Sequence, residues 1–332
     1  MKAAQITEPQ KIELADIPMP ELEESEVLIK VMASGICGTD IHIFRGDYLG
    51  EYPVVPGHEF SGIIQEIGKK AKKFKRGDRV AVEPNIACEN CCNCLNNRQN
   101  FCANWRAVGV TLSGGMAQYV AVPEKNVFNI GNISFEIGAF VEPLSCVIHG
   151  IERAGISLAD KIAILGAGPI GMLLLKTVKL QGALEITLVD KNEKRLHLAG
   201  KAGADFIYGS LKDLRQDYFD VVIDATGVIS VMSETINYVR PGGRVLLFGV
   251  PPSGKNMEIE PFIIFRKGLT ILSSFTSLKN SYQAVGLLTS GKIDVADLVS
   301  HKLQLSDLQS GIEMIERGIN NVMKVMISPN TT

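Results

Sequence analysis

The sequence of 332 residues has no apolar run long enough to span a bilayer, and its start, MKAAQITEPQ, lacks the apolar core of a signal peptide. An excess of charge of one sign is also missing, because 34 lysines and arginines stand against 36 aspartates and glutamates. The resulting net charge of −2 gives no long-range attraction to nucleic acid or to an acidic membrane. No internal repeat or low-complexity tract is present. We therefore expect neither a nucleic-acid nor a membrane partner.

Size and cysteine usage set the broad class. A chain of 332 residues is longer than one hydrophobic core usually supports, so we expect two domains. Apolar residues make up 46% and charged residues 21%, as in an ordinary globular protein. The seven cysteines are odd in number and mostly clustered, which fits a reducing compartment. The sequence therefore predicts a cytoplasmic protein.

One basic run departs from this balance of charge. It comprises Lys69, Lys70, Lys72, Lys73, Lys75 and Arg76. The segment GDRV that follows indicates a hairpin turn entering a strand. We interpret the run as the solvated edge of a hairpin, where cations are common, rather than as a patch for nucleic acid.

Four cysteines in the stretch CENCCNCLNNRQNFC have the spacing of ligands to one ion. They are Cys88, Cys91, Cys94 and Cys102. Four thiolates complete the tetrahedral shell of Zn²⁺ and leave no position for a substrate, so this ion is predicted to hold a loop together. Cys92 offers a fifth thiol, and an exchange with Cys91 stays open. Disulfides or a nucleic-acid-binding zinc ribbon compete with this interpretation, but the sequence looks neither secreted nor basic.

The predicted secondary structure changes in character near Glu142. Before it, alternating segments such as VLIKVMAS and DRVAVEP lie between Gly, Pro and Asn turns, a pattern typical of an all-β, barrel-like domain. After it, strands such as KIAIL and ITLVD alternate with helices such as KNEKRLHLAGKAG, which predicts a doubly wound parallel sheet. From about residue 277 the tail leads to KVMIS, a strand that needs a sheet and would find one in the first domain.

The segment GAGPIG follows a strand and opens a helix, which is the context of a dinucleotide-binding turn. Gly166 permits a tight turn, Gly168 lets the backbone approach a pyrophosphate, and Gly171 allows close packing of the helix. Pro169 and Ile170 complete the turn at the helix N-terminus, which attracts the anionic phosphates.

Asp190 closes the next strand, ITLVD, about twenty residues after the turn. A carboxylate at this place accepts hydrogen bonds from ribose hydroxyls and repels a 2′-phosphate, so it favours NAD over NADP. Lys191, Lys194 and Arg195 argue the other way, because cations there could hold a phosphate. We expect NAD, with Arg195 among the residues that bind it.

A second group of metal-ligand residues lies in the β-rich part. Cys37 stands in GICGTDIH, and His58 and Glu59 stand in GHEFSG. A thiolate, an imidazole and a carboxylate from separate loops make the three-ligand, open-position site of a catalytic zinc. Taken singly, Cys37 could be a buried apolar residue and His58 a core histidine. Their occurrence beside a dinucleotide-binding fold favours the metal site.

Together these motifs give the chain a resemblance to the zinc-dependent medium-chain dehydrogenases, the alcohol dehydrogenase superfamily. The resemblance runs in order through GICGTDIH, GHEFSG, GDRV, the four-cysteine lobe, GGMAQY, VEPLSC and GAGPIG. It implies a GroES-like β-barrel catalytic domain over residues 1–143 and 277–332, with a structural zinc lobe at about 88–102, and a Rossmann NAD-binding domain over residues 144–276. It also implies two zinc ions per subunit, one catalytic and one structural, and a homo-oligomer, either tetramer or dimer.

The segment VEPLSC resembles the sorbitol, xylitol and arabinitol dehydrogenase branch, with Glu142 where typical alcohol dehydrogenases have a cysteine ligand. By that resemblance Cys37, His58 and Glu59 hold the catalytic zinc, and Glu142 lies beside it. A thiolate and one carboxylate already neutralise Zn²⁺, and a second direct carboxylate would weaken its Lewis acidity. One of the two glutamates is therefore expected to act through water, and which one stays open.

The same resemblance implies further roles. Asp40 would orient the ligand histidine. Thr39 would accept the substrate's hydroxyl proton, and His42 would return it to solvent. The alternative without a function is that Asp40 is a surface turn residue and His42 a partly exposed polar residue.

The substrate is predicted from loops 43–52 and 104–116, which line the pocket by family analogy. They carry Arg45, Tyr48, Trp105 and Arg106. Polar, aromatic and cationic groups suit a polyol or a polyol phosphate better than ethanol, since guanidinium matches phosphate geometry. We expect oxidation of a secondary alcohol of such a substrate to a ketose. A threonine- or butanediol-type dehydrogenase is the alternative within the family.

Two functions from other classes are less consistent with the sequence. A non-catalytic NAD-binding regulatory protein would have lost metal ligands or Thr39, yet all are present. An RNA-binding role for the cysteine lobe would call for surrounding basic residues, and the lobe instead carries Glu89, Arg98 and several asparagines.

Overall fold

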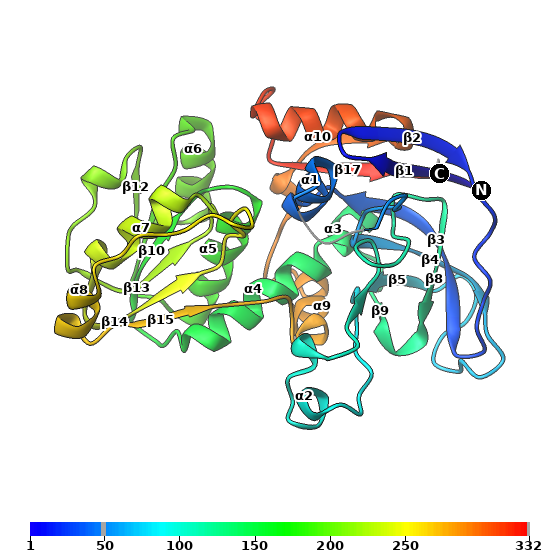
Figure 1. Cartoon of the computed structure of the whole chain (residues 1–332), viewed down its shortest axis with the longest axis horizontal. Helices are drawn as coiled ribbons and strands as arrows, with labels where there is room; N and C mark the ends of the chain where they lie inside the picture. The colour runs from blue at the N-terminus through cyan, green and yellow to red at the C-terminus, as the bar shows by residue number, and fades with distance from the viewer. Residues whose placement is uncertain (48–50, 331–332) are drawn as a thin grey trace. The chain divides into compact units, whose positions relative to one another are not determined.

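The computed structural model describes residues 1–47 and 51–330. The chain forms two compact units, one made of Met1–Ser145 and Ser277–Thr332, the other of Cys146–Thr276. In Figure 1 the colours of the first unit run from blue through cyan to bluish green and then from orange to red, and those of the second run from green to gold. Among the described residues, no helix is long and apolar enough to cross a membrane.

The first unit is built on a seven-stranded sheet. Its strand order is β16-β17-β3-β4-β5-β9, with β8 paired to β3. The strands are β3 (Glu26–Gly35), β4 (Glu59–Ile67), β5 (Arg79–Val82), β8 (Tyr119–Pro123), β9 (Val127–Asn129), β16 (Val299–Gln304) and β17 (Lys324–Ser328). The last strand, β17, pairs antiparallel with β3, where Met326 lies opposite Gly35. This pairing ties the end of the chain to a strand near its beginning.

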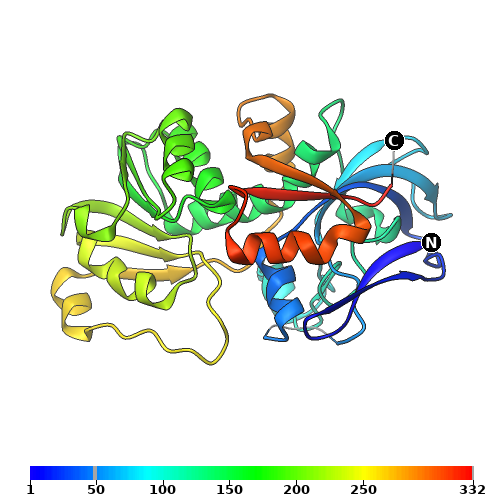
Figure 2. The ribbon, with the colours of Figure 1, turned by 90° about the horizontal axis from the view of Figure 1, so that it is seen from above.

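Smaller elements surround this sheet. Two strand pairs are β1 (Lys2–Glu8) with β2 (Lys11–Asp16), and β6 (Asn85–Ile86) with β7 (Arg106–Ala107). The helices are α1 (Gly38–Arg45), α2 (Cys92–Leu95), α3 (Phe135–Ala139), α9 (Ser281–Thr289) and α10 (Leu308–Arg317), with short 3₁₀ turns at Gln99–Phe101, Glu124–Asn126, Ala296–Leu298 and Leu305–Asp307. Helix α10 packs against β2, as both ribbon views show (Figures 1 and 2). A core that includes Ile6, Ile43 and Ile327 joins these early and late segments.

The second unit holds a six-stranded sheet in the order β12-β11-β10-β13-β14-β15. Every neighbouring pair is parallel, which confirms the predicted Rossmann-type sheet. The strands are β10 (Lys161–Leu165), β11 (Glu185–Val189), β12 (Phe206–Tyr208), β13 (Phe219–Asp224), β14 (Val239–Leu247) and β15 (Thr270–Ser273). The helices are α5 (Pro169–Gln181), α6 (Glu193–Ala202), α7 (Ile229–Tyr238) and α8 (Pro261–Lys267), with a 3₁₀ turn at Leu211–Asp213. Helix α4 (Val141–Ala154) leads into this unit.

The sequence explains the parallel sheet. Its central strands are apolar on both faces, as the fully buried Ile162, Ile164 and Val222 show, because helices cover both sides of such sheets. Helix α5 ends where Gly182 adopts the left-handed conformation, with φ of 91°, and α6 ends at Gly203 with φ of 101°. Both helices therefore end at glycine, which has no Cβ and adopts the left-handed conformation without steric strain.

The basic run forms an exposed turn between β4 and β5, as predicted. Gly77, in the GDRV segment, has φ of 92°, and β5 begins two residues later at Arg79. Lys70 pairs with Glu24, and the Lys73 ammonium lies 5.1 Å from the Phe74 ring centroid. These contacts fit a solvated hairpin edge.

Candidate metal centres and dinucleotide turn

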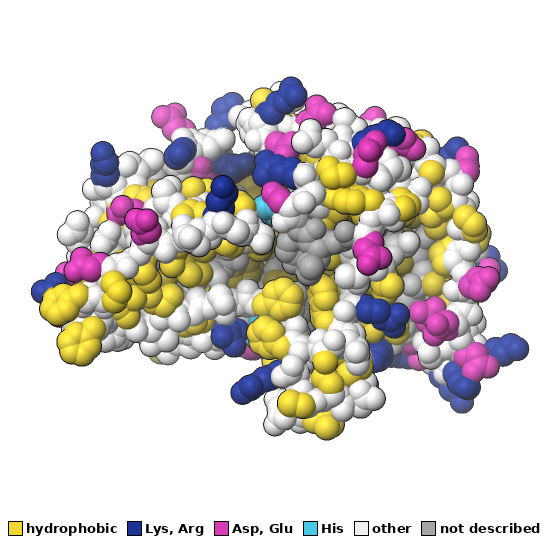
Figure 3. Space-filling view, in the orientation of Figure 1, with side chains coloured by type: hydrophobic (Ala, Val, Ile, Leu, Met, Phe, Trp, Pro, Cys, Tyr) yellow, Lys and Arg dark blue, Asp and Glu magenta, His cyan; other side chains and the backbone are white. Residues whose placement is uncertain are grey.

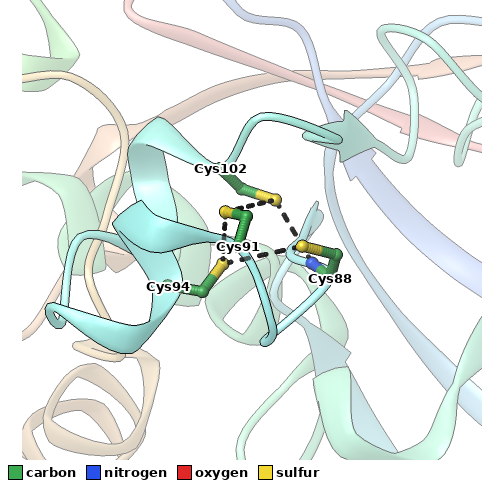
Figure 4. A group of neighbouring side chains, drawn as sticks. All are labelled: Cys88, Cys91, Cys94 and Cys102. Atoms are coloured by element: carbon green, nitrogen blue, oxygen red, sulfur yellow. Dashed lines mark hydrogen bonds between the residues drawn. The ribbon is translucent and has the colours of Figure 1, made fainter.

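The four cysteines of the lobe meet at one point. Their sulfur atoms lie within 4.8 Å of one another, and Sγ to Sγ distances are 3.5 Å for Cys91 and Cys94 and 4.0 Å for Cys91 and Cys102 (Figure 4). Sulfurs bound at about 2.3 Å to a tetrahedral Zn²⁺ would lie about 3.8 Å apart. The set therefore fits a closed zinc site. Cys92 is exposed and lies outside the set.

The local fold explains this convergence. Helix α2 is a single turn that starts directly after Cys91, so Cys94 comes round to the same side. Glu89 and Asn97 take left-handed conformations with φ of 63° and 55°, which tighten the loop on both sides of that turn. Backbone hydrogen bonds from Ala103 and Cys94 lower the pKa of Cys91 to about 6, whereas burial raises the pKa of Cys94 to about 12. A zinc ion would displace the protons that the thiols still carry.

The base of the lobe is fixed by amide side chains. The Trp105 indole N–H donates to Asn85 Oδ1 at 3.0 Å, and Asn126 Nδ2 donates to the carbonyl oxygens of Glu83 and Asn85, both at 2.8 Å. The sequence predicts Trp105 in the substrate pocket. In the structure its indole N–H contacts Asn85, and its ring packs on the apolar core of the first unit.

A second cluster brings together Cys37, His58 and Glu59. One ligand atom from each residue lies within 4.8 Å of the other two. Glu59 opens β4 and lies opposite Gly35, the last residue of β3, so Cys37 follows two residues beyond that pairing. His58 is 6% exposed and Glu59 is 1% exposed. The strand register, rather than sequence proximity, creates this site.

Asp40 supports both ligand loops from a fully buried position. Its Oδ2 accepts the backbone N–H of Cys37 at 2.8 Å, and its Oδ1 accepts the backbone N–H of Gly57 at 3.1 Å. Its Oδ1 also lies 3.6 Å from His58 Nδ1. Asp40 is therefore no surface turn residue. Its position suits the predicted role of orienting the ligand histidine.

The electrostatics of this cluster fit a bound cation. Burial alone would lower the pKa of His58, but the negative charges of Cys37 and Asp40 raise it well above its usual value. Burial, together with the charge of Glu59, raises the pKa of the Cys37 thiol. A divalent ion held by Cys37, His58 and Glu59 would displace the protons from the thiol and the imidazole.

Lys324 is a residue at this site that sequence reasoning missed. It lies on β17, is 4% exposed, and its Nζ forms an ion pair with Glu59 Oε2. The distance along the chain between the two residues hides this relationship. One sequence signal existed, because a lysine opening the apolar strand KVMIS needs a buried partner.

The other predicted catalytic residues are Thr39, His42 and Glu142. Thr39 and His42 stand three residues apart on α1, so they share one side of that helix. His42 Nδ1 lies 2.8 Å from Asp47 Oδ1. Glu142 is 8% exposed in the first turn of α4, but the metal-binding set found among the described residues does not include it.

The dinucleotide turn has the geometry that its glycines predict. Gly166 has φ of 106°, and a Cβ on Gly171 would lie 1.8 Å from the Gly166 carbonyl oxygen. A Cβ on Gly168 would meet only the Arg195 guanidinium, at 3.9 Å, so this glycine faces open space. Pro169 begins α5, with Ile170 next to it. The turn thus leaves room for a phosphate at a helix N-terminus.

Asp190 follows β11 and is bonded to the turn itself. Its Oδ2 accepts the backbone N–H of Ala167 at 2.7 Å, and its Oδ1 accepts that of Asn192 at 2.8 Å. The side chain of Asn192 caps α6 by accepting from the N–H groups of Lys194 and Arg195. The carboxylate is therefore held in place before any cofactor binds.

The remaining residues predicted to line the substrate pocket are Arg45, Arg106 and Tyr48. Arg45 Nε donates to Glu316 Oε1 on α10 at 2.6 Å, so part of its guanidinium is already engaged. Arg106 is exposed. Tyr48 lies outside the described residues.

Comparison with known proteins agrees with this geometry. The chain matches the model of the alcohol dehydrogenase GroES-like domain over residues 23–132 and that of the zinc-binding dehydrogenases over residues 169–290. It is 36% identical to D-altritol 5-dehydrogenase of Agrobacterium fabrum, covering 93% of this chain and 94% of the relative. It is 32% identical to D-arabinitol dehydrogenase 1 of Uromyces fabae, with coverage of 99% and 97%. L-threonine 3-dehydrogenase of Bacillus velezensis is also 32% identical, with 92% coverage of both chains.

Solved structures show the same likeness. A Sinorhizobium meliloti 1021 protein described as a zinc-binding dehydrogenase, bound to NADP, superposes with a TM-score of 0.94 at 33% identity, covering 99% of both chains. Galactitol-1-phosphate dehydrogenase of Escherichia coli has a TM-score of 0.90 at 27% identity and covers 99% of this chain and 100% of its own.

Proposed function

Since the chain belongs to the zinc-dependent medium-chain dehydrogenases of the alcohol dehydrogenase superfamily, we propose that it oxidises a secondary hydroxyl of a polyol or polyol phosphate to a ketone. The observation that carries this proposal is the buried set of Cys37, His58 and Glu59, in a chain that also holds a dinucleotide turn. Relatives named as altritol and arabinitol dehydrogenases support the substrate class.

Two metal ions and NAD complete the proposal. A zinc ion at the Cys37 set would act as a Lewis acid that lowers the pKa of the substrate hydroxyl, and NAD would accept the hydride. The four-cysteine set would hold a second, structural zinc. Asp190 supports NAD, because a ribose 2′-phosphate would meet its carboxylate. The four clustered thiols also favour a reducing compartment, and we propose the cytoplasm.

The proposed roles of the residues concern the path by which the substrate hydroxyl proton leaves. A bound nicotinamide would accept the hydride of the substrate C–H bond, and residues of this chain would carry away the hydroxyl proton. Thr39, half-buried on α1, would accept the hydroxyl hydrogen bond and pass the proton on. His42, held by Asp47, would release the proton to solvent. Glu142 would bind a neighbouring substrate hydroxyl directly or through water. This interaction would favour polyols over simple alcohols.

The arginines bear on the choice between polyol and polyol phosphate. Arg45 is paired with Glu316, and the two side chains are 46% and 22% exposed. A phosphate would have to compete with this carboxylate for the guanidinium. We therefore put the neutral polyol first and its phosphate ester second.

A substrate panel tests the proposal. Pentitols, hexitols, their phosphates, threonine, butane-2,3-diol and simple alcohols would be compared by NADH absorbance. Polyols should give the highest kcat/KM. Best turnover on ethanol or propan-2-ol would refute the polyol assignment, and best turnover on threonine would move it to the activity of the threonine dehydrogenase relatives. No turnover on any alcohol by zinc-loaded protein would favour the non-catalytic alternative.

We also propose a homo-oligomer that forms through α8 and the adjoining sheet edge. Phe262 and Phe265 on α8 are 62% and 81% exposed, and their ring centroids lie 6.3 Å apart. Figure 3 shows hydrophobic side chains gathered where Figure 1 places α8. The helix is followed by β15, the last strand of its sheet, whose outer backbone groups could pair with a second copy.

A further inference from the structure

A buried lysine beside the candidate metal ligands carries an inference beyond the proposed roles. Lysine side chains are almost never fully buried unless they are paired. The side chains of Lys324 and Glu59 are 5% and 1% exposed, and they form an ion pair. Glu59 is also one of the three residues whose ligand atoms converge. One carboxylate therefore serves both a lysine and the candidate metal centre.

The backbone leaves space for this pair. A Cβ on Gly35 would lie 2.5 Å from Glu59 Oε2 and 2.8 Å from Lys324 Cε. Gly35 lies opposite Glu59 in one strand pair and opposite Met326 in another, so it separates β4 from β17 at this point. The absence of a side chain at Gly35 lets Lys324 reach across β3 to Glu59.

The groups around the lysine are acidic. The Lys324 ammonium pairs with the Glu59 carboxylate, and the fully buried Asp40 carboxylate accepts the backbone N–H groups of Cys37 and Gly57. The lysine thus brings a positive charge to an otherwise anionic centre.

We propose that Lys324 is a positioning residue that sets the charge of the metal centre by holding and neutralising the Glu59 carboxylate. This inference rests on the proposed function, because it assigns a zinc ion to Cys37 and His58. A paired Glu59 donates less charge to that ion, which therefore keeps its Lewis acidity. Without Lys324, Glu59 would be a full-strength carboxylate ligand and the centre would hold zinc more tightly.

The test compares zinc affinity in Lys324→Met, Glu59→Gln and the double variant. The dissociation constant of the more readily extracted zinc ion would be measured by competition with a chromophoric chelator, in the absence of substrate. Lys324→Met should lower that dissociation constant, and reduce kcat, each on the order of 10-fold to 100-fold. Glu59→Gln should raise the dissociation constant. The double variant should resemble Glu59→Gln, because the lysine acts only through that carboxylate.

The sign of the change separates this role from damage to the fold. A merely structural lysine would weaken zinc binding when it is removed. Lys267→Met is the matched control, because Lys267 is 7% exposed, pairs with Asp217 and lies in the other unit. This control should leave zinc affinity unchanged.

Unchanged or weaker zinc binding in Lys324→Met would overturn the inference while leaving the proposed dehydrogenase activity intact. If the unmodified protein bound only one zinc ion, the proposed function itself would fail. The two failures are therefore distinguishable.

Discussion

The Asp190 carboxylate accepts a hydrogen bond from the backbone N–H of Ala167 at 2.7 Å. The residue predicted to bind the cofactor ribose therefore also stabilises the glycine turn. We therefore expect a substitution at this position to change both the preference between NAD and NADP and the conformation of the turn.

Asp190→Ala should narrow the preference for NAD over NADP. It removes the charge that repels a 2′-phosphate, and it also loosens the turn, so kcat/KM for NAD should fall by about 10-fold or more. Steady-state kinetics with both cofactors measure the effect. Asp205→Ala is the control, since Asp205 accepts the backbone N–H of Ile186 at 2.8 Å near the opposite end of β11. Equal use of both cofactors by the unmodified enzyme would instead point to Lys191 or Arg195.

Cys94→Ser should remove about one zinc ion per chain and lower the thermal midpoint. Cys94 is 4% exposed within the four-sulfur set, and loss of one ligand leaves a zinc site that cannot close. Cys92→Ser is the matched control because its thiol is exposed and outside the set. Elemental analysis and a melting curve test the pair. Loss of zinc from the Cys92 variant would reverse our assignment of the ligands.

Thr39→Val should reduce kcat by roughly 10²-fold to 10⁴-fold, because it removes the hydroxyl through which we propose that the substrate proton leaves. Thr39→Ser, which keeps the hydroxyl, should retain most of the activity. Zinc content should be normal in both variants, since Thr39 is not among the converging ligands. Comparable rates for the valine and serine variants would exclude Thr39 from the proton path.

Asp220→Asn should destabilise the second unit by about 1–3 kcal/mol near neutral pH. Burial opposes ionisation of Asp220, but hydrogen bonds from the Lys161 backbone N–H and Arg240 lower its pKa below the usual value. A lowered folded-state pKa stabilises the fold above the unfolded-state pKa, and this contribution is lost as the pH falls through the folded-state value. The difference in unfolding free energy should therefore shrink on acidification. Denaturant titrations at several pH values would show it, and a constant difference would contradict the role of the charge.

Replacing Phe262 and Phe265 together by serine should shift the protein towards monomer in light scattering after gel filtration. The two side chains are 62% and 81% exposed on α8, so their loss should remove apolar contact area without disturbing the core. Tyr282→Ser is the control, because Tyr282 is 78% exposed in the other unit. An oligomer unaffected by the double variant would place the interface elsewhere.

Short-range sequence relationships determined much of this protein. The cysteine spacing in residues 88–102 predicted a metal lobe because nearby residues need only one helical turn to meet. The GAGPIG turn and Asp190 predicted a dinucleotide site because strand, turn and helix follow one another in the chain. Alternating strands and helices likewise predicted the parallel sheet.

Tertiary structure decided what depends on strands that are distant in sequence. Lys324 reaches Glu59 only because β17 pairs with β3 and β3 pairs with β4, with Gly35 leaving the space. Arg45 and Glu316 meet because α1 and α10 belong to one unit, although 271 residues separate them. Trp105 donates its indole N–H to Asn85, a contact across 20 residues that the sequence did not predict. Ion pairs and hydrogen bonds act over a few ångströms, so their partners are fixed by register and packing, which local residue patterns do not contain.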